Sequence, residues 1–136
     1  MQRPYIIELP KFLDYRGNLS FVQEMDHIPF KIQRTYWIYD VPGGENRGGH
    51  AYKNTNEFII AISGGFDVIV DDGITKEKFT LNRSYYGLFI PRGVWRTIEN
   101  FSTNSFALEF ADTKYDRNDY IEDYSMYQNM KSNGEI

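Results

Sequence analysis

The residues of this chain best suited to acid–base chemistry are His50, Tyr52 and Glu57. His50 and Tyr52 are two positions apart in a predicted strand (49–53), so both side chains point to the same face, about 7 Å apart. Glu57 opens the next predicted strand (57–62). This brings its carboxylate beside the strand that carries His50. Histidine, with an ordinary pKa of about 6.5, suits a general base, and tyrosine, with a pKa near 10, suits a proton donor. The alternative is that His50 and Tyr52 only satisfy each other as buried polar side chains.

Four arginines could hold an anion near these groups. Arg16 lies in an Asp-Tyr-Arg-Gly turn, Arg34 in a predicted strand, Arg47 just before the histidine, and Arg96 in a later strand. A guanidinium forks onto phosphate or carboxylate oxygens, so we expect at least two of them, Arg47 and Arg96 foremost, to line one cavity. The chain has no Gly-x4-Gly-Lys-Ser/Thr loop and no Gly-x-Gly-x2-Gly before a helix. The predicted substrate is therefore an anion such as a nucleotide diphosphate, bound by side chains.

The elements that must position these residues are strands. Short runs rich in β-branched and aromatic residues recur about every ten residues, separated by turns, which is typical of a sandwich or barrel. The predicted strands are 5–8, 19–24, 32–39, 49–53, 57–62, 65–70, 76–81, 86–90, 95–100 and 105–111. Asp72-Gly73 predicts a hairpin with a type I′ turn, because Asp-Gly accepts the positive φ angles that this turn needs.

Three features lie outside the predicted strands. Residues 14–17 form a predicted turn that carries Arg16. From 116 to 130 the apolar residues take up a helical period, and Asp116 or Asn118 is placed to cap the first turn, so we expect a terminal helix packed outside the strands. His27, the only other histidine, is expected in a surface loop without a catalytic role.

Length, charge and cysteine content narrow the class of protein. The 136 residues are enough for one domain with one core, which we assign to 1–136. The absence of cysteine excludes disulfides and thiolate chemistry and fits a reducing compartment, so a cytoplasmic location is expected. A net charge of −4 offers no basic face for nucleic acid or an anionic membrane. The apolar run 5–7 is too short for a signal peptide or a membrane span.

The spacing around His50 resembles the two motifs of the cupin superfamily. The first motif, Gly-x5-His-x-His-x3–4-Glu-x6-Gly, is matched by Gly44, His50, Glu57 and Gly64, and the second, Pro-x-Gly-x2-His-x3-Asn, by Pro91, Gly93 and Asn100. In cupins three histidines and the glutamate bind a metal inside a small β-barrel. Tyr52 and Arg96 replace two of these ligands here, which leaves fewer than a transition-metal site usually has. The resemblance implies an all-β, cupin-type jelly-roll barrel with a short C-terminal α-helix, and we expect chemistry without a metal.

Longer segments resemble the dTDP-sugar 3,4-ketoisomerases. These segments are 14–19, 28–36, 47–53, 71–73, 86–91, 94–96, 99–102 and 115–121, in order along nearly the whole chain. The resemblance implies an enzyme that converts dTDP-4-keto-6-deoxyglucose to its 3-keto isomer through an enediolate, for 3-amino-3,6-dideoxyhexose synthesis. It also implies a homodimer partly built by exchanged strands, and neither a metal nor an organic cofactor.

The resemblance implies roles for particular side chains. His50 matches the first family histidine and is the predicted base. The proton donors are Tyr36 and Tyr52, and the substrate-binding residues are Arg16, Arg47, Arg96 and Glu57. The family usually has His-x-His where this chain has His50-x-Tyr52, so either Tyr52 serves as the acid partner or activity is altered or lost. A dTDP-sugar-binding cupin without catalysis and a metal-dependent cupin such as an oxygenase are the alternatives.

Overall fold

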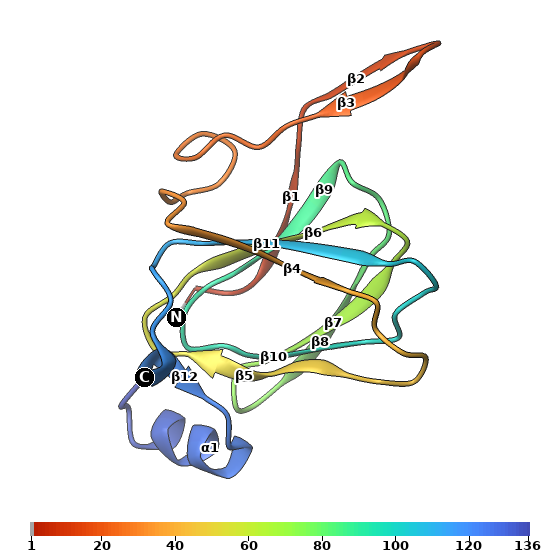
Figure 1. Cartoon of the computed structure of the whole chain (residues 1–136). Coiled ribbons are helices and arrows are strands. Elements are labelled where there is room, and N and C mark those ends of the chain that lie inside the picture. The colour runs from red at the N-terminus through yellow and green to blue at the C-terminus, as the bar shows by residue number, and fades with distance from the viewer. Residues whose placement is uncertain (1) are drawn as a thin grey trace.

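The computed structural model describes residues 2–136, and its main feature is a pair of facing antiparallel sheets (Figure 1). The first sheet has the order β1 (Tyr5–Glu8), β9 (Tyr86–Ile90), β6 (Glu57–Ser63), β11 (Phe106–Ala111), β4 (Arg34–Tyr39). The second has the order β12 (Tyr120–Ile121), β5 (Arg47–Tyr52), β10 (Trp95–Glu99), β7 (Phe66–Asp71), β8 (Lys76–Leu81). A separate hairpin is formed by β2 (Lys11–Asp14) and β3 (Gly17–Ser20), and the chain closes with η1 (Arg117–Asp119) and α1 (Tyr124–Ser132). The predicted all-β jelly roll with a short C-terminal helix is confirmed.

The core lies between the two sheets. Ile59 and Leu88 from the first sheet meet Val68 and Ile98 from the second, and all four side chains are fully buried. Burying a side chain of this size contributes about 1.5–3 kcal/mol relative to exposing it. The other face of β6 is also covered, because the chain between β3 and β4 packs on it with Ile28 and other apolar residues. Burial on both faces explains why β6 is apolar along most of its length, and this strand fixes the position of Glu57.

The predicted helix 116–130 is wrong in its first half. Asp116 accepts a hydrogen bond from the backbone of Asn118 at 2.9 Å, but it caps only η1. The next two residues, β12, then pair with the end of β5, with Tyr120 opposite Tyr52. The α-helix begins later, where Asp123 accepts from the Met126 backbone at 2.9 Å. The apolar spacing that suggested a helix serves a short strand instead, and this places Tyr120 beside the predicted site.

The predicted turn at 14–17 and the predicted hairpin at Asp72-Gly73 are both present, with differences in detail. At 14–17 the turn joins β2 to β3, so the predicted strand 19–24 lies too late in the chain and β2 was missed. At 72–75 the pairing of Asp71 with Lys76 leaves a four-residue loop rather than a two-residue type I′ turn. Gly73 has a positive φ of 94°, while the Asp72 carboxylate accepts from two backbone amides of the loop. Asp72 therefore does not adopt the positive φ that a type I′ turn needs, and its carboxylate stabilises the loop by hydrogen bonds instead.

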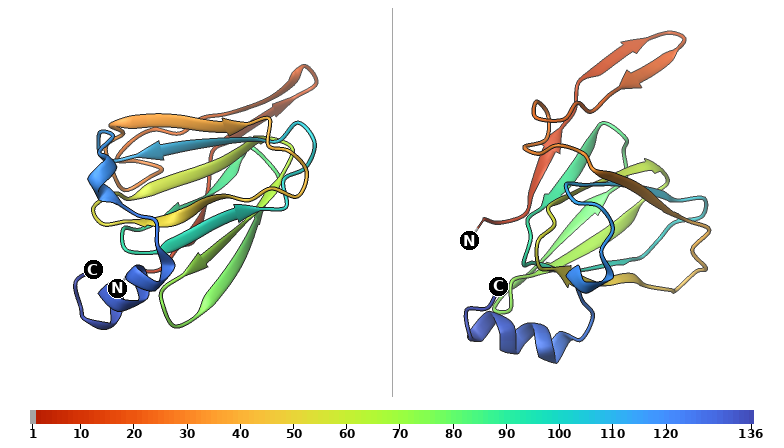
Figure 2. Two further views of the ribbon diagram at one scale, coloured as in Figure 1. Left: turned by 60° about the horizontal axis from the view of Figure 1, so that its bottom comes forward. Right: turned by 60° about the vertical axis from the view of Figure 1, so that its left-hand side comes forward.

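The β2–β3 hairpin extends away from both sheets (Figures 1 and 2). Its apolar side chains are exposed, with Phe12 60%, Leu13 63% and Leu19 58% accessible to solvent. The terminal helix lies at the opposite end, outside the second sheet, and buries Tyr127 against it. No helix among residues 2–136 has the length and apolar character to cross a membrane.

Candidate active site

Three aromatic rings meet at the end of β5. His50 and Tyr52 share one face of this strand, with ring centroids 4.7 Å apart, and Tyr120 from β12 lies 4.9 Å and 4.8 Å from them. His50 is half-buried, and its Nδ1 atom is buried with no hydrogen-bond partner among the described residues. Burial, followed by the charge of Arg96, lowers the pKa of His50 to about 2. The imidazole is therefore neutral and has a nitrogen available to accept a proton.

A network of hydroxyl groups joins the two sheets at this point. The Tyr52 hydroxyl lies 3.0 Å from that of Tyr36 on β4, in the opposite sheet, and donates to the Tyr120 hydroxyl at 3.2 Å. It also accepts a hydrogen bond from Nη2 of Arg34 at 3.3 Å. Burial raises the pKa of Tyr36 and of Tyr52 well above the usual 10. Both phenols are consequently protonated at neutral pH and can donate.

Arg96 lies beneath this network, with a side chain only 1% exposed. Nε and Nη2 donate to the two Glu57 oxygens at 3.0 and 2.9 Å, and Nη2 also donates to Glu109 at 2.9 Å and to the Tyr36 hydroxyl at 3.0 Å. Nη1 donates to the Gly48 carbonyl at 3.1 Å. Each nitrogen of the Arg96 guanidinium thus donates to another residue of the protein, and one of these bonds goes to the Tyr36 hydroxyl. Of the predicted substrate-binding residues, Glu57 and Arg96 bind each other.

Gly48 allows this close approach. Its φ is 72°, in the left-handed region that favours glycine, and a Cβ at this position would overlap Nη1 of Arg96. The carbonyl that Arg96 uses comes from the same residue. Gly48, two residues before His50, is therefore part of the site.

Glu109 is the buried residue that the sequence prediction missed. It is 0% exposed, and its Oε2 atom has no hydrogen-bond partner among residues 2–136. Burial raises the pKa of Glu109 well above its usual value, and the adjacent Glu57 carboxylate raises it further against the opposing effect of Arg96. Burial beside Glu57 thus favours the neutral form of Glu109, in which Glu57 balances the charge of Arg96. The available signal was an acid in the buried row of β11, between Ala107 and Ala111.

The remaining predicted residues lie farther out. Arg47 is exposed at the start of β5. Arg16 is in the turn between β2 and β3, where its side chain is 74% exposed and pairs with Asp14 at 2.9 Å. Within residues 2–136 the Arg16 side chain contacts Asp14 and Tyr15 and not the cluster around His50. His27 is in a loop as predicted, half-buried, and its Nδ1 accepts from the Gln23 backbone at 2.9 Å.

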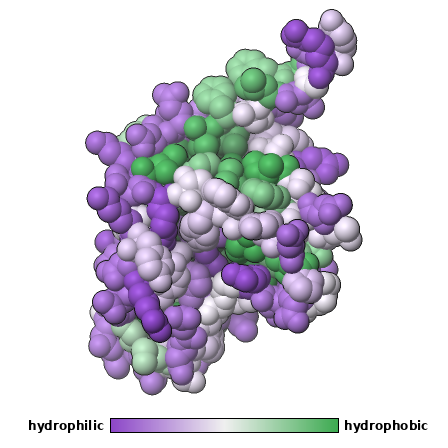
Figure 3. All heavy atoms as spheres, viewed as in Figure 1, coloured by the Kyte–Doolittle hydropathy of each residue, from purple (hydrophilic) through white to green (hydrophobic). Residues whose placement is uncertain are grey.

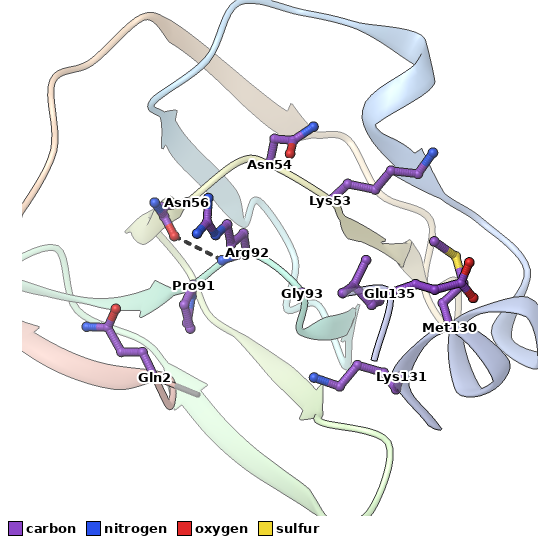
Figure 4. A pocket seen from close by; sticks show the side chains of 11 residues that line it. Gln2, Lys53, Asn54, Asn56, Pro91, Arg92, Gly93, Met130, Lys131 and Glu135 are labelled. Atoms are coloured by element: carbon purple, nitrogen blue, oxygen red, sulfur yellow. Dashed lines mark hydrogen bonds between the residues drawn. The ribbon is translucent and has the colours of Figure 1, made fainter. Parts of the chain in front are cut away.

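A pocket of about 1010 Å³ lies elsewhere, between the β5–β6 loop, the β9–β10 loop and the end of the chain (Figure 4). Lys53, Arg92 and Lys131 give it basic side chains, with Glu135 among them. None of the predicted catalytic or substrate-binding residues lines this pocket. Its size alone does not make it the reaction site.

The donor set at the motif positions does not fit a metal ion. Across the described residues, 2–136, no three His, Cys, Asp or Glu side chains are grouped so that they could hold one. Of the two motif ligands that remain, Glu57 uses both oxygens on Arg96. The Glu57 carboxylate, which a metal would need as a ligand, is therefore already paired with the guanidinium of Arg96.

Comparison with known proteins identifies the family of this chain. Residues 2–132 match the family described as FdtA: WxcM-like, C-terminal. Over 123 residues the chain is 35% identical to TDP-4-oxo-6-deoxy-alpha-D-glucose-3,4-oxoisomerase of Aneurinibacillus thermoaerophilus, covering 90% of this chain and 88% of that protein.

Solved structures of similar proteins cover nearly the whole chain. A 3,4-ketoisomerase from Helicobacter canadensis is 34% identical with a TM-score of 0.92, covering 95% of this chain and 97% of that one. The sugar 3,4-ketoisomerase QdtA from Thermoanaerobacterium thermosaccharolyticum, in complex with TDP, is 27% identical with a TM-score of 0.94, covering 98% of each chain. A mutant of QdtA has been solved with TDP-4-keto-6-deoxyglucose. The chain therefore belongs to the FdtA family, WxcM-like, C-terminal.

Proposed function

We propose that this protein is a sugar-nucleotide 3,4-ketoisomerase that converts dTDP-4-keto-6-deoxyglucose to its dTDP-3-keto-6-deoxyhexose isomer. Family membership supports this activity. The observation that carries it is one cluster containing a neutral imidazole with an unpartnered nitrogen and protonated tyrosine hydroxyls. Neither a metal nor an organic cofactor is part of the proposal.

The proposed reaction moves a carbonyl by one carbon. His50 takes the proton from C3, the C–H electron pair forms a C3–C4 double bond, and the carbonyl pair moves onto the C4 oxygen. Hydrogen bonds from Tyr36 and Tyr52 stabilise the resulting enediolate. The C3 hydroxyl proton passes to the C4 oxygen, C4 receives a proton, and the carbonyl forms at C3. Tyr52 is the proposed donor to C4, in place of the second family histidine.

The substrate diphosphate needs cations that Arg96 cannot supply from its buried position. We assign this contact to Arg47, which is exposed at the start of the strand of His50. Glu57 then acts by holding Arg96 and, through it, the Tyr36 hydroxyl. In this proposal Glu57 supports the substrate site through Arg96 and does not itself contact the substrate.

We also propose a homodimer. The apolar side chains of the β2–β3 hairpin remain exposed among residues 2–136, and Figure 3 shows apolar side chains gathered where the hairpin leaves the sheets. A second copy would cover them, and its Arg16 would then approach the site from outside. Light scattering should give twice the monomer mass of 16.0 kDa, and a value near the monomer mass at micromolar concentration would contradict the proposal.

The proposed setting is cytoplasmic nucleotide-sugar metabolism. The absence of cysteine supports a reducing compartment. The 3-keto product would serve 3-amino-3,6-dideoxyhexose synthesis for a glycan such as lipopolysaccharide or an S-layer. The unit acting there is the domain 1–136.

The test is incubation of the purified protein with dTDP-4-keto-6-deoxyglucose in metal-free buffer, followed by NMR. A 3-keto product is expected, and its C4 configuration reveals whether the enzyme is galacto-forming or gluco-forming. Unreacted substrate, under conditions where a family enzyme turns over, would refute the proposal. Tyr52 in the place of a histidine favours a second candidate, a non-catalytic dTDP-sugar-binding protein, which calorimetry would identify by dTDP binding without turnover.

A further inference from the structure

Arg34 is a positively charged residue at the site that has no counter-ion among residues 2–136. In β4 the side chains of Arg34, Tyr36 and Ile38 point to the more buried face, so the guanidinium is half-buried at a position that usually takes an apolar residue. Within residues 2–136 it makes no ion pair with any carboxylate. The guanidinium of Arg96, by contrast, is held by Glu57 and Glu109.

Aromatic rings hold Arg34 in place. Its guanidinium carbon lies 5.5 Å from the Tyr36 ring centre, 5.7 Å from that of Tyr52 and 5.8 Å from that of Tyr115. Such contacts favour a cation over the face of a ring. The one hydrogen bond of the Arg34 side chain within the described residues goes from Nη2 to the Tyr52 hydroxyl. The Tyr52 hydroxyl oxygen is thus the group that the charged guanidinium of Arg34 hydrogen-bonds.

That oxygen is where a charge develops in the proposed reaction. When a histidinium donates a proton it becomes neutral, but when a tyrosine donates it leaves a phenolate. Burial opposes this anion, since it raises the pKa of Tyr52. A hydrogen bond from an unpaired guanidinium to the phenolate oxygen offsets that effect. Tyr36 lacks this advantage, because burial and the charge of Glu57 act against its ionisation and the Arg96 guanidinium beside it is already paired with Glu57.

We propose that Arg34 is the positioning residue that enables Tyr52 to act as the proton donor, so that an Arg34–Tyr52 pair replaces the second histidine of the family. The inference rests on the proposed ketoisomerase function. In the step concerned, the O–H bond of Tyr52 breaks, its proton bonds to C4, and the electron pair stays on the phenolate beside Arg34. The imidazolium that His50 formed in the first step then returns its proton to the phenolate, which restores both side chains.

The test separates the two halves of the reaction. Exchange of the C3 hydrogen for deuterium in D2O reports proton removal by His50, and the 3-keto product reports proton delivery to C4. For Arg34→Met we expect product formation to fall about 100-fold, with C3 exchange and dTDP affinity changed by less than about threefold. Arg34→Lys, which keeps the charge, should recover at least about a tenth of the wild-type rate. Arg83→Met, on the exposed β8–β9 turn, is the matched control and should behave as wild type.

A double-mutant cycle tests whether Arg34 acts through Tyr52. If it does, adding Arg34→Met to Tyr52→Phe lowers product formation by less than about twofold beyond Tyr52→Phe alone. Additive losses, equal losses of exchange and product, or full activity of Arg34→Met would each overturn the inference. Arg34→Gln replaces Arg34→Met if the latter does not fold, as judged by its thermal unfolding. Failure of the wild-type protein to form any product would instead refute the ketoisomerase function itself.

Discussion

The buried neutral state of His50 predicts a specific dependence of stability on pH. The ordinary pKa of 6.5 applies to the unfolded chain, and the folded value is about 2. Between these values the unfolded chain binds a proton that the folded chain does not, so the free energy of unfolding falls as the pH drops below 6.5 and is unaffected above it. At about pH 4.5 the loss from this group has an upper value of about 2.7 kcal/mol, and we expect about 1–2 kcal/mol because His50 is partly exposed.

Urea denaturation at about pH 7.5 and about pH 4.5 measures this effect. Other groups also titrate in this range, so the quantity of interest is the difference between wild type and His50→Asn. The variant should lose about 1–2 kcal/mol less than wild type on acidification. An equal loss in wild type and His50→Asn would refute the conclusion that burial keeps this imidazole neutral.

Four further substitutions test the supporting structure. Gly48→Ala should cost at least about 2 kcal/mol of stability and most of the activity, because it combines a positive φ with a clash against Arg96; thermal unfolding and turnover measure both. Glu57→Gln should destabilise the protein by about 3 kcal/mol by leaving a buried cation without its carboxylate, whereas Glu109→Gln should change the free energy of unfolding by less than about 1 kcal/mol; similar effects of the two would contradict a neutral Glu109. Phe12→Ser should weaken the proposed dimer, seen as a shift toward 16.0 kDa in light scattering, and an unchanged mass would exclude the hairpin from the interface.

Much of the fold could be predicted from local pattern. The apolar run of β6 indicates a strand buried on both faces, and the period of two in β5 places His50 and Tyr52 together. The end of the chain could not be predicted in this way. A run of apolar residues at helical spacing also fits a short strand, and pairing with β5 decides in favour of the strand at Tyr120. That pairing is a contact between distant segments, which local periodicity does not contain.

The sequence identified several residues of the site but not how their side chains are arranged. Spacing identified Arg96 and Glu57, but only the facing of two sheets shows that they bind each other beneath Tyr36. Arg34 was identified only as one of four arginines that could hold an anion, and Glu109 was not identified at all. Each is a charged residue type in the buried row of a strand, and the sequence gives no distance from which to choose their partners.

The most direct test of the central claim is the turnover of dTDP-4-keto-6-deoxyglucose by wild type and His50→Asn, with dTDP binding measured alongside. Asparagine keeps approximate size and polarity but removes the titratable nitrogen. We predict that the rate falls by at least about 100-fold while dTDP affinity stays nearly unchanged. If His50→Asn retains most of the wild-type rate, His50 is not the base and the chemistry does not lie on this strand.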